Sequence, residues 1–427
     1  MSYIIENPRG TCVLGGVNNV LSAVTKVCPI YHSGPGCCMQ TAAGESGQAG
    51  LRAPYYLSNV SMPSSNMLER EVVFGGEQKL RDEIDGALEI IDADAYFVLT
   101  GCTAGIIGDD IEAVTADYRN CGLPVYPITT PGFKGDSLLG YEIAFQAFTD
   151  FIVEIPNKRE GNLVNLWGVI PYHDPYWAGA LEEMTRILGK LGLRVNTFFT
   201  ENQDIDVVRA SGAAALNIIV SPYLLRKTAK NYEEKFGVPS LRFDGVPIGP
   251  TQTGEFVRGV AEALKLDDDL VNRVLWEESA YVYNYFETII GAFSWKRFAV
   301  AADAGTAIGV TRFLADDFSL TPSAVVVTDQ IWDESDKERI TGRLTKLEYA
   351  RPPKISFASD HYEIREELKK HDFSLLLGSS LEDEVARELD VQLQRVAYPI
   401  SDVMVLNRSY AGFRGCLTLV EDLFSNL

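Results

Sequence analysis

The chain has 427 residues, more than one ordinary hydrophobic core supports, and length alone predicts roughly two to four domains. It is 46% hydrophobic and 23% charged, which excludes a disordered chain, and its net charge of −21 argues against nucleic acid as a partner. No apolar run reaches the roughly 18 residues of a membrane span, and the first ten residues lack the features of a signal peptide. We therefore expect a cytoplasmic protein that has no membrane partner.

Short apolar runs alternate with amphipathic stretches, which is the pattern of βαβ units and parallel sheets. Residues 95–101 predict a buried strand, residues 109–122 the helix that follows it, and residues 124–133 the next strand and its loop. Asp109 or Asp110 is the expected N-cap of that helix, because a carboxylate can accept a hydrogen bond from the free N–H groups of the first turn.

The same pattern restarts near residues 158 and 292. The expected elements after these restarts are a strand at 162–170, a helix at 177–192, strands at LRVNTFF and ALNIIVS, a helical connector at 267–293, a strand–loop–helix unit at 296–314, and strands at PSAVVVTDQ, KISFASD, FSLLLGSS and QLQRVAYPI. We therefore predict three successive α/β units, with domains over residues 1–158, 159–292 and 293–427.

Common catalytic motifs are missing from the sequence. It contains no P-loop and no G-x-S-x-G elbow, and its four histidines are not spaced as zinc ligands. Residues 302–309 form a glycine turn between a strand and a helix, but they lack the dinucleotide fingerprint G-x-G-x-x-G. The chemistry is therefore expected to depend on cysteines.

Three of the seven cysteines, Cys12, Cys37 and Cys102, lie at glycine-rich turns. Cys102 directly follows a predicted strand, and ligands of open α/β sheets bind beyond the carboxyl ends of the strands. Glycine lets backbone N–H groups approach a sulfur atom, which suits anionic clusters. Three thiolates could hold zinc, or they could hold an iron–sulfur cluster whose usual four cysteines a second chain would complete.

The remaining cysteines have other expected roles. Cys28, Cys121 and Cys416 lie within apolar strand or helix patterns, so we expect them to be core thiols. The odd number of cysteines and the lack of an export signal favour reduced thiols over disulfides. Cys38 is adjacent to Cys37, and adjacent side chains point in different directions, so only one of the two is expected to face a common site.

Seven segments stand out as sequence motifs. They are NPRGTC (7–12), HSGPGC (32–37), VVFGGEQKL (72–80), LTGCTAGIIGDDIEAV (99–114), TTPGFKG (129–135), VPIGPTQTGEF (246–256) and AYPISDVMVLNRSYAGFRGCLTLVEDL (397–423). Together they resemble component 1 of nitrogenase, the dinitrogenase family, and the last segment resembles the C-terminal signature of its β-type subunits. The resemblance covers nearly the whole chain and implies three Rossmann-like domains with parallel sheets.

The resemblance also implies a cofactor and partners. It makes Cys12, Cys37 and Cys102, and not Cys38, thiolate ligands of a P-cluster-like 8Fe–7S cluster that is shared with an α-type subunit in an α2β2 heterotetramer. It implies that an ATP-dependent iron protein delivers electrons to this cluster, and it places Phe74 in the surface where that protein docks. From the residues alone, a core phenylalanine that starts a helix is the alternative for Phe74.

The matches also indicate which subunit and which reaction to expect. The segment that matches the cofactor cysteine of α-type subunits, residues 218–226, has no cysteine, and residues 372–427 have no histidine, so the chain resembles the electron-relaying β-type subunit. Gly132 stands where molybdenum nitrogenase has a serine that binds the oxidised cluster. Three cysteines and this glycine favour a nitrogenase-like reductase such as methylthio-alkane reductase, which cleaves C–S bonds. The alternatives are the β subunit of an N2-reducing nitrogenase, a 4Fe–4S protein, and a non-catalytic scaffold for cofactor assembly.

Overall fold

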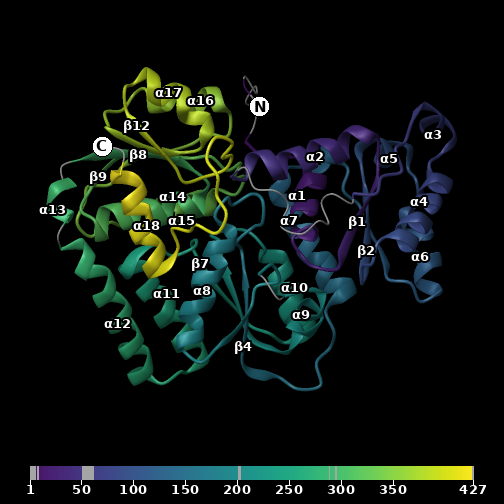
Figure 1. Ribbon diagram of the computed structural model, residues 1–427, viewed down its shortest axis with the longest axis horizontal. Coiled ribbons are helices and arrows are strands. Elements are labelled where there is room, and N and C mark those ends of the chain that lie inside the picture. Colours follow the sequence, from purple (N-terminus) through teal and green to yellow (C-terminus); the bar gives the residue numbers. More distant parts are fainter. Residues whose placement is uncertain are drawn as a thin grey trace.

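The described residues form three parallel β-sheets with helices on their faces (Figure 1). The computed structural model describes residues 6, 9–50, 62–200, 203–287, 289–293 and 296–425. Residues 7 and 8, the first two of the NPRGTC motif, lie outside that set. The α/β fold class is confirmed, and the boundaries of the three domains stay a prediction.

The first sheet has the strand order β1-β2-β3. Its region comprises α1 (Val13–Leu21), β1 (Val27–His32), α2 (Pro35–Gln48), α3 (Glu69–Phe74), α4 (Glu77–Ile90), β2 (Ala95–Thr100), α5 (Cys102–Ile107), α6 (Ile111–Asn120), β3 (Val125–Ile128) and α7 (Ser137–Ala147). Every residue of β1 and β2 is buried, because helices cover both faces of a parallel sheet. Asp110 caps α6 by accepting a hydrogen bond from the Ala113 N–H at 2.9 Å. It was one of the two residues predicted to cap this helix.

The second sheet has the order β5-β4-β6-β7. Its region comprises β4 (Glu160–Trp167), α8 (Trp177–Lys190), β5 (Arg194–Asn196), α9 (Ile205–Ala210), β6 (Ala214–Val220), α10 (Arg226–Phe236), β7 (Ser240–Phe243) and α11 (Gly249–Leu264). The strand and helix expected at 162–170 and 177–192 correspond to β4 and α8. Strand β7 was not predicted, because its four residues, SLRF, alternate polar and apolar over too short a run to stand out.

The third sheet has the order β10-β9-β8-β11-β12. Its region comprises α12 (Asp268–Phe286), α13 (Ile290–Phe293), β8 (Arg297–Ala302), α14 (Ala304–Arg312), β9 (Thr321–Val327), α15 (Glu334–Thr345), β10 (Lys354–Phe357), α16 (His361–Leu368), β11 (Leu375–Gly378), α17 (Asp383–Glu388), β12 (Gln392–Arg395) and α18 (Gly412–Phe424). The expected connector at 267–293 contains α12 and α13. Among the described residues, no helix is long and apolar enough to cross a membrane.

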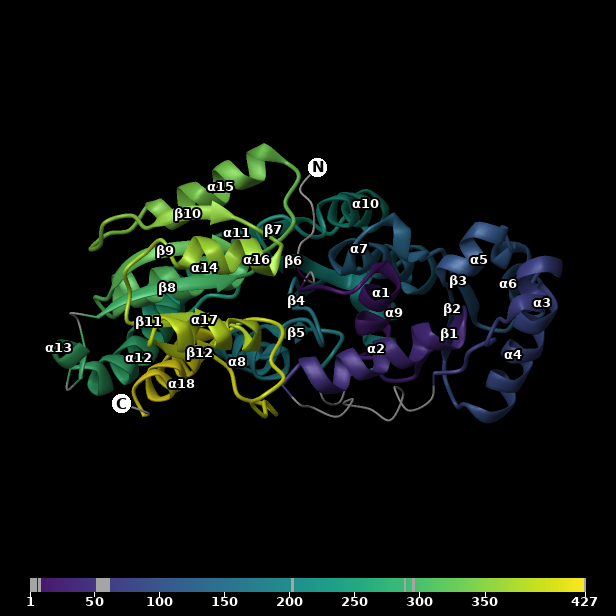
Figure 2. The same ribbon diagram turned by 90° about the horizontal axis from the view of Figure 1, so that it is seen from above.

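The first and third sheets lie at opposite ends of the molecule, and the second sheet lies between them (Figures 1 and 2). Helices α1 and α7 pack where the first region meets the second. Their backbones touch at two glycines, because a Cβ atom on Gly16 would lie 2.2 Å from the Ser137 carbonyl oxygen and one on Gly140 would lie 2.4 Å from the Val13 carbonyl oxygen. This close contact fixes the start of α1 against the start of α7.

Candidate functional site

Each of the three predicted ligand cysteines lies at the start of a helix. Cys12 is the N-cap of α1, Cys37 lies in the first turn of α2, and Cys102 is the first residue of α5. Strands β1 and β2 are adjacent and parallel, with His32 paired to Thr100, so the turns that follow them emerge at the same edge of the sheet.

Cys12 and Cys102 meet at Gly132, and Cys37 lies near both of them. A Cβ atom built on Gly132 would lie 3.1 Å from the Cys102 sulfur and 3.3 Å from the Cys12 sulfur. Burial raises the pKa of the Cys37 thiol, and the nearby thiols of Cys12 and Cys102 raise it further, while a hydrogen bond with Ser33 acts in the opposite direction. The fold therefore brings together three turns that are 25 or more residues apart in the sequence.

The backbone holds Cys12 firmly in this group. Cys12 forms an isolated antiparallel bridge with Asp136, and the Val13 N–H donates to the Gly135 carbonyl at 3.2 Å. The Ser137 N–H donates to the Thr11 carbonyl at 2.8 Å on the other side of Cys12. The loop that contains Gly132 thus runs alongside Cys12, in keeping with the close contact of α1 and α7.

The other cysteines lie elsewhere. Cys38 directs its sulfur to the Met62 carbonyl oxygen at 3.5 Å, whereas Cys28 and Cys416 are buried, as predicted. Burial raises the pKa of Cys28 to about 12, which keeps that thiol protonated. The prediction that Cys121 is a core thiol is wrong, since Cys121 is exposed. It follows the last residue of α6, where the helix ends at a surface turn and nothing packs over the side chain.

The donor set suits an iron–sulfur group. Among the described residues, no three His, Cys, Asp or Glu side chains are arranged to hold a single metal ion. Thiolates that do not enclose one ion can each bind a different iron of a larger cluster. The missing side chain of Gly132 leaves open the space beside Cys12 and Cys102. The three cysteines and the glycine therefore fit the cluster that the sequence resemblance implies.

Exposed apolar side chains lie on elements that carry or adjoin the cysteines. Phe74 ends α3 and is 82% exposed, so it is not a core phenylalanine that starts a helix. Helix α3 lies next to α5 in both views (Figures 1 and 2). Among the described residues, the other exposed large apolar side chains near these turns are Met39, Leu68, Val72, Val73, Ile106 and Phe133. We call this set, with Phe74, the apolar surface around the cysteines.

A buried polar pair lies beneath this surface, and the sequence analysis did not find it. The His32 Nε2 atom lies 2.8 Å from the Asp109 Oδ2 atom, and its Nδ1 atom lies 3.0 Å from the Ser65 Oγ atom. Burial lowers the pKa of His32, although the hydrogen bond with Asp109 acts in the opposite direction. Asp109 also accepts the Gly76 N–H on both oxygens, at 3.0 and 3.1 Å. Asp109 was one of two expected helix caps, but its carboxylate binds these groups instead.

A cavity of about 100 Å³ lies among the three regions. It is lined by Ser221, which falls in the segment that matches the cofactor cysteine of α-type subunits, and no cysteine lines it among the described residues. Its polar lining includes His173 and the carboxyl groups of Asp174 and Asp329. Burial raises the pKa of each of these carboxyl groups to about 7. The cavity therefore lacks the thiolate that would hold a metal–sulfur cofactor.

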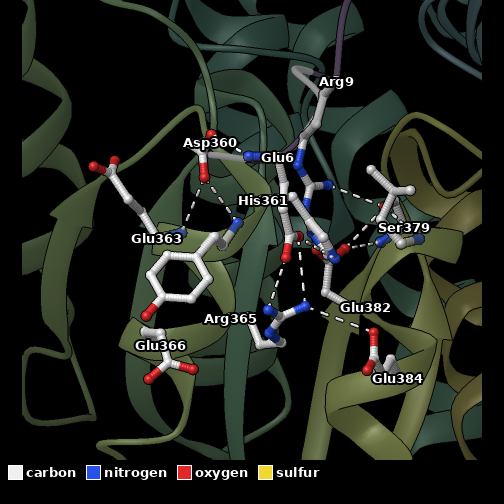
Figure 3. A network of polar contacts seen from close by, with 12 residues as sticks. Glu6, Arg9, Asp360, His361, Glu363, Arg365, Glu366, Ser379, Glu382 and Glu384 are labelled. Atoms are coloured by element: carbon white, nitrogen blue, oxygen red, sulfur yellow. Dashed lines mark hydrogen bonds and ion pairs between the residues drawn. The ribbon is translucent and has the colours of Figure 1, made fainter. Parts of the chain in front are cut away.

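A second polar network fastens the N-terminal segment to the third region (Figure 3). Arg9 forms an ion pair with Glu382 and donates to the Ser379 Oγ atom at 3.0 Å, and these side chains are buried. Three residues upstream, Glu6 pairs with Arg365 at 2.8 Å nearer the surface. Arg9 precedes Cys12 by three residues, so the network anchors the chain just before the first cysteine.

Comparisons with known proteins identify the family to which the chain belongs. A family model described as nitrogenase component 1 type oxidoreductase matches residues 12–427. The nitrogenase iron-molybdenum cofactor biosynthesis protein NifE of Methanococcus maripaludis is 27% identical over 277 residues, which are 62% of this chain and 53% of that protein, so the chain spans about half the length of this relative. NifE of Clostridium pasteurianum is 25% identical over 391 residues, 89% of this chain and 80% of that protein.

Two further proteins bear on the subunit and the fold. The nitrogenase molybdenum-iron protein alpha chain of Clostridium pasteurianum is 30% identical over 291 residues, 65% of this chain and 52% of that protein. The solved structure titled "Nitrogenase Cp1 at pH 6.5" superposes with a TM-score of 0.83 at 19% identity and covers 100% of this chain and 93% of that chain. At this identity the superposition shows a common fold and no more.

Proposed function

Because the chain belongs to the nitrogenase component 1 type oxidoreductase family, we propose that it is the cluster-bearing subunit of a nitrogenase-like complex. Cys12, Cys37 and Cys102 bind the irons of an iron–sulfur cluster as thiolates. The observation that carries this proposal is the convergence of the three cysteines, with Cys12 and Cys102 placed against Gly132 and Cys37 near both. When bound, a cluster of this kind supplies a one-electron store of low potential.

The cluster lies at an interface with a second chain. Three thiolates are an incomplete ligand set, and the thiols of Cys12 and Cys102 are exposed, so another subunit can complete the coordination. We expect a P-cluster-like 8Fe–7S cluster shared with an α-type subunit in an α2β2 heterotetramer, and a 4Fe–4S cluster is the alternative. The exposed apolar side chains around the cysteines other than Phe74 support this expectation, because a partner subunit would remove them from water.

Electrons enter from a separate protein in this proposal. The sequence has no nucleotide motif of its own, so an ATP-dependent iron protein supplies them. Phe74 belongs to the surface where that protein docks, and its 82% exposure next to the helix that begins at Cys102 supports this role. Replacing Phe74 with Ala should slow electron delivery and leave the iron content unchanged.

For the complex as a whole, we favour cofactor assembly over substrate turnover. The relatives named NifE are cofactor biosynthesis proteins by name, and the central cavity of this chain has no cysteine beside Ser221. In this role the chain relays electrons within a complex that matures a metal–sulfur cofactor and passes it on.

A catalytic complex is the second candidate. The 30% identity with a molybdenum-iron protein alpha chain favours it. Such a complex would reduce N2 or cleave the C–S bond of a methylthio-alkane, as the sequence resemblance suggested.

One preparation tests both candidates. The chain is co-purified with its α-type partner without oxygen, and its iron is counted. The complex is then supplied with the iron protein and ATP and assayed for ammonia, for ethylene and methanethiol from a methylthio-alkane, and for transfer of metal to an apo-acceptor. Metal transfer without turnover supports assembly, and turnover of either substrate supports catalysis. A complex without iron would contradict the cluster-bearing role.

A further inference from the structure

His32 and Asp109 form a bridge between elements that are distant in sequence. His32 ends β1 and is fully buried, and its imidazole lies between the Ser65 hydroxyl and the Asp109 carboxylate. The two residues are 77 positions apart, and only 5% of the Asp109 side chain is exposed. A buried carboxylate with hydrogen-bond partners on both oxygens is held in one position. Moving it would break a hydrogen bond and leave a buried polar group without a partner, which costs free energy.

His32 and Asp109 are each connected to a turn that carries a proposed cluster ligand. His32 is five residues before Cys37, and the turn between them starts at Ser33, which hydrogen-bonds the Cys37 thiol. Asp109 lies two residues after α5, the helix that begins at Cys102. The Gly101 N–H donates to the His32 carbonyl at 2.9 Å, so the backbones of the two cysteine turns also join at this point.

Asp109 is also connected, through Gly76, to the helix that carries the proposed docking residue Phe74. Gly76 joins α3, which ends at Phe74, to α4, and its N–H group binds the Asp109 carboxylate. A Cβ atom on Gly76 would lie 2.7 Å from the Asp109 Oδ2 atom and 2.9 Å from the His32 ring. Only glycine therefore lets the connection between α3 and α4 come this close to the pair.

We propose that His32 and Asp109 are positioning residues that hold α3 in a fixed place relative to the Cys37 and Cys102 turns. An electron-donor protein seated on Phe74 then meets the cluster at a set distance and orientation. This inference rests on the proposed function, and it adds the residues that connect the donor surface to the cluster. One electron passes from the reduced donor to the cluster, and no covalent bond forms or breaks.

The test separates delivery by a protein from delivery by a small reductant. Asp109→Asn keeps the size of the side chain but removes its charge and one acceptor oxygen. The matched control is Asp110→Asn, which alters the adjacent carboxylate, a cap of α6 that faces solvent. Both variants are prepared as the complex with the α-type partner, and cluster reduction is followed by absorbance, once with dithionite and once with the iron protein and ATP.

We expect Asp109→Asn to retain its iron and to be reduced by dithionite at the wild-type rate. Delivery from the iron protein should slow by at least about tenfold, because a 1 Å misplacement of reacting groups costs about 100-fold. Asp110→Asn should match wild type in both assays. Gly76→Ala displaces the same connection without removing a charge, so it should reproduce the Asp109→Asn result and serves as the second variant if Asp109→Asn does not fold.

Wild-type delivery from the iron protein in both Asp109→Asn and Gly76→Ala would overturn the inference. Loss of iron, or equal slowing with both reductants, would also overturn it, because the pair would then maintain the cluster itself. A wild-type complex that contains no cluster would contradict the proposed function instead, so the two failures are distinguishable.

Discussion

Replacing Arg9 with Met is a direct test of how the chain is anchored before Cys12. The Arg9 and Glu382 side chains are 7% and 0% exposed. Removing one partner of a buried ion pair leaves an uncompensated charge and costs about 3–5 kcal/mol. The pair between Arg365 and Glu6 is the matched control, because those side chains lie nearer the surface, at 16% and 31% exposed, and Arg365→Met should cost much less than Arg9→Met.

Hydrogen–deuterium exchange measures this cost locally. Each 1.4 kcal/mol is a factor of about ten, so Arg9→Met should speed exchange of the amides of residues 380–388 by about two to three and a half orders of magnitude. Arg365→Met should change the exchange rate of the same amides by less than about tenfold. The double variant Arg9→Met/Glu382→Gln removes the buried charge as well and should recover much of the loss. Equal exchange in Arg9→Met and Arg365→Met would refute this reasoning.

Three further predictions concern the cysteines and the central cavity. Cys37→Ala in the complex should lower the iron content and the visible absorption, whereas Cys38→Ala should do much less because its sulfur faces a carbonyl; equal losses would contradict the assignment. Gly132→Ala should also lower the iron content, since its methyl group would crowd the Cys102 sulfur at 3.1 Å, and Gly36→Ala, which has open space, is the control that should keep its iron. Burial raises the pKa of Asp174 from its ordinary value of 3.8 to about 7, so the folded state holds this proton more tightly and the associated stability is lost as the pH rises through 7. The melting temperature should therefore fall less between pH 5 and pH 8 in Asp174→Asn than in wild type, and parallel curves would argue against this titration.

Local patterns were enough to predict the parallel α/β fold. Buried strands such as 95–100 and amphipathic helices such as 177–190 carry their periodicity in adjacent residues. The glycine turns likewise marked Cys12, Cys37 and Cys102 as a set, because a turn after a strand points to the edge where ligands bind.

Contacts between distant residues could not be predicted in the same way. His32 and Asp109 are 77 residues apart, and no local pattern connects a histidine at the end of one strand to a carboxylate beyond the next. Arg9 and Glu382 are 373 residues apart and meet only because the third region folds back on the N-terminal segment. The prediction that Cys121 is a core thiol was wrong for a related reason. The burial of a residue at a helix end depends on which other element covers it, and that element is distant in the sequence.

The contact between α1 and α7 has a consequence for how this sequence can vary. Gly16 and Gly140 meet backbone atoms of the facing segment, so any larger residue at either position must push the two helices apart. Such a shift would travel along α1 to Cys12 at its first turn and move a sulfur atom without altering any ligand. Two positions that carry no functional group are thus as restricted as the cysteines themselves, and a screen for loss of iron should recover substitutions at both.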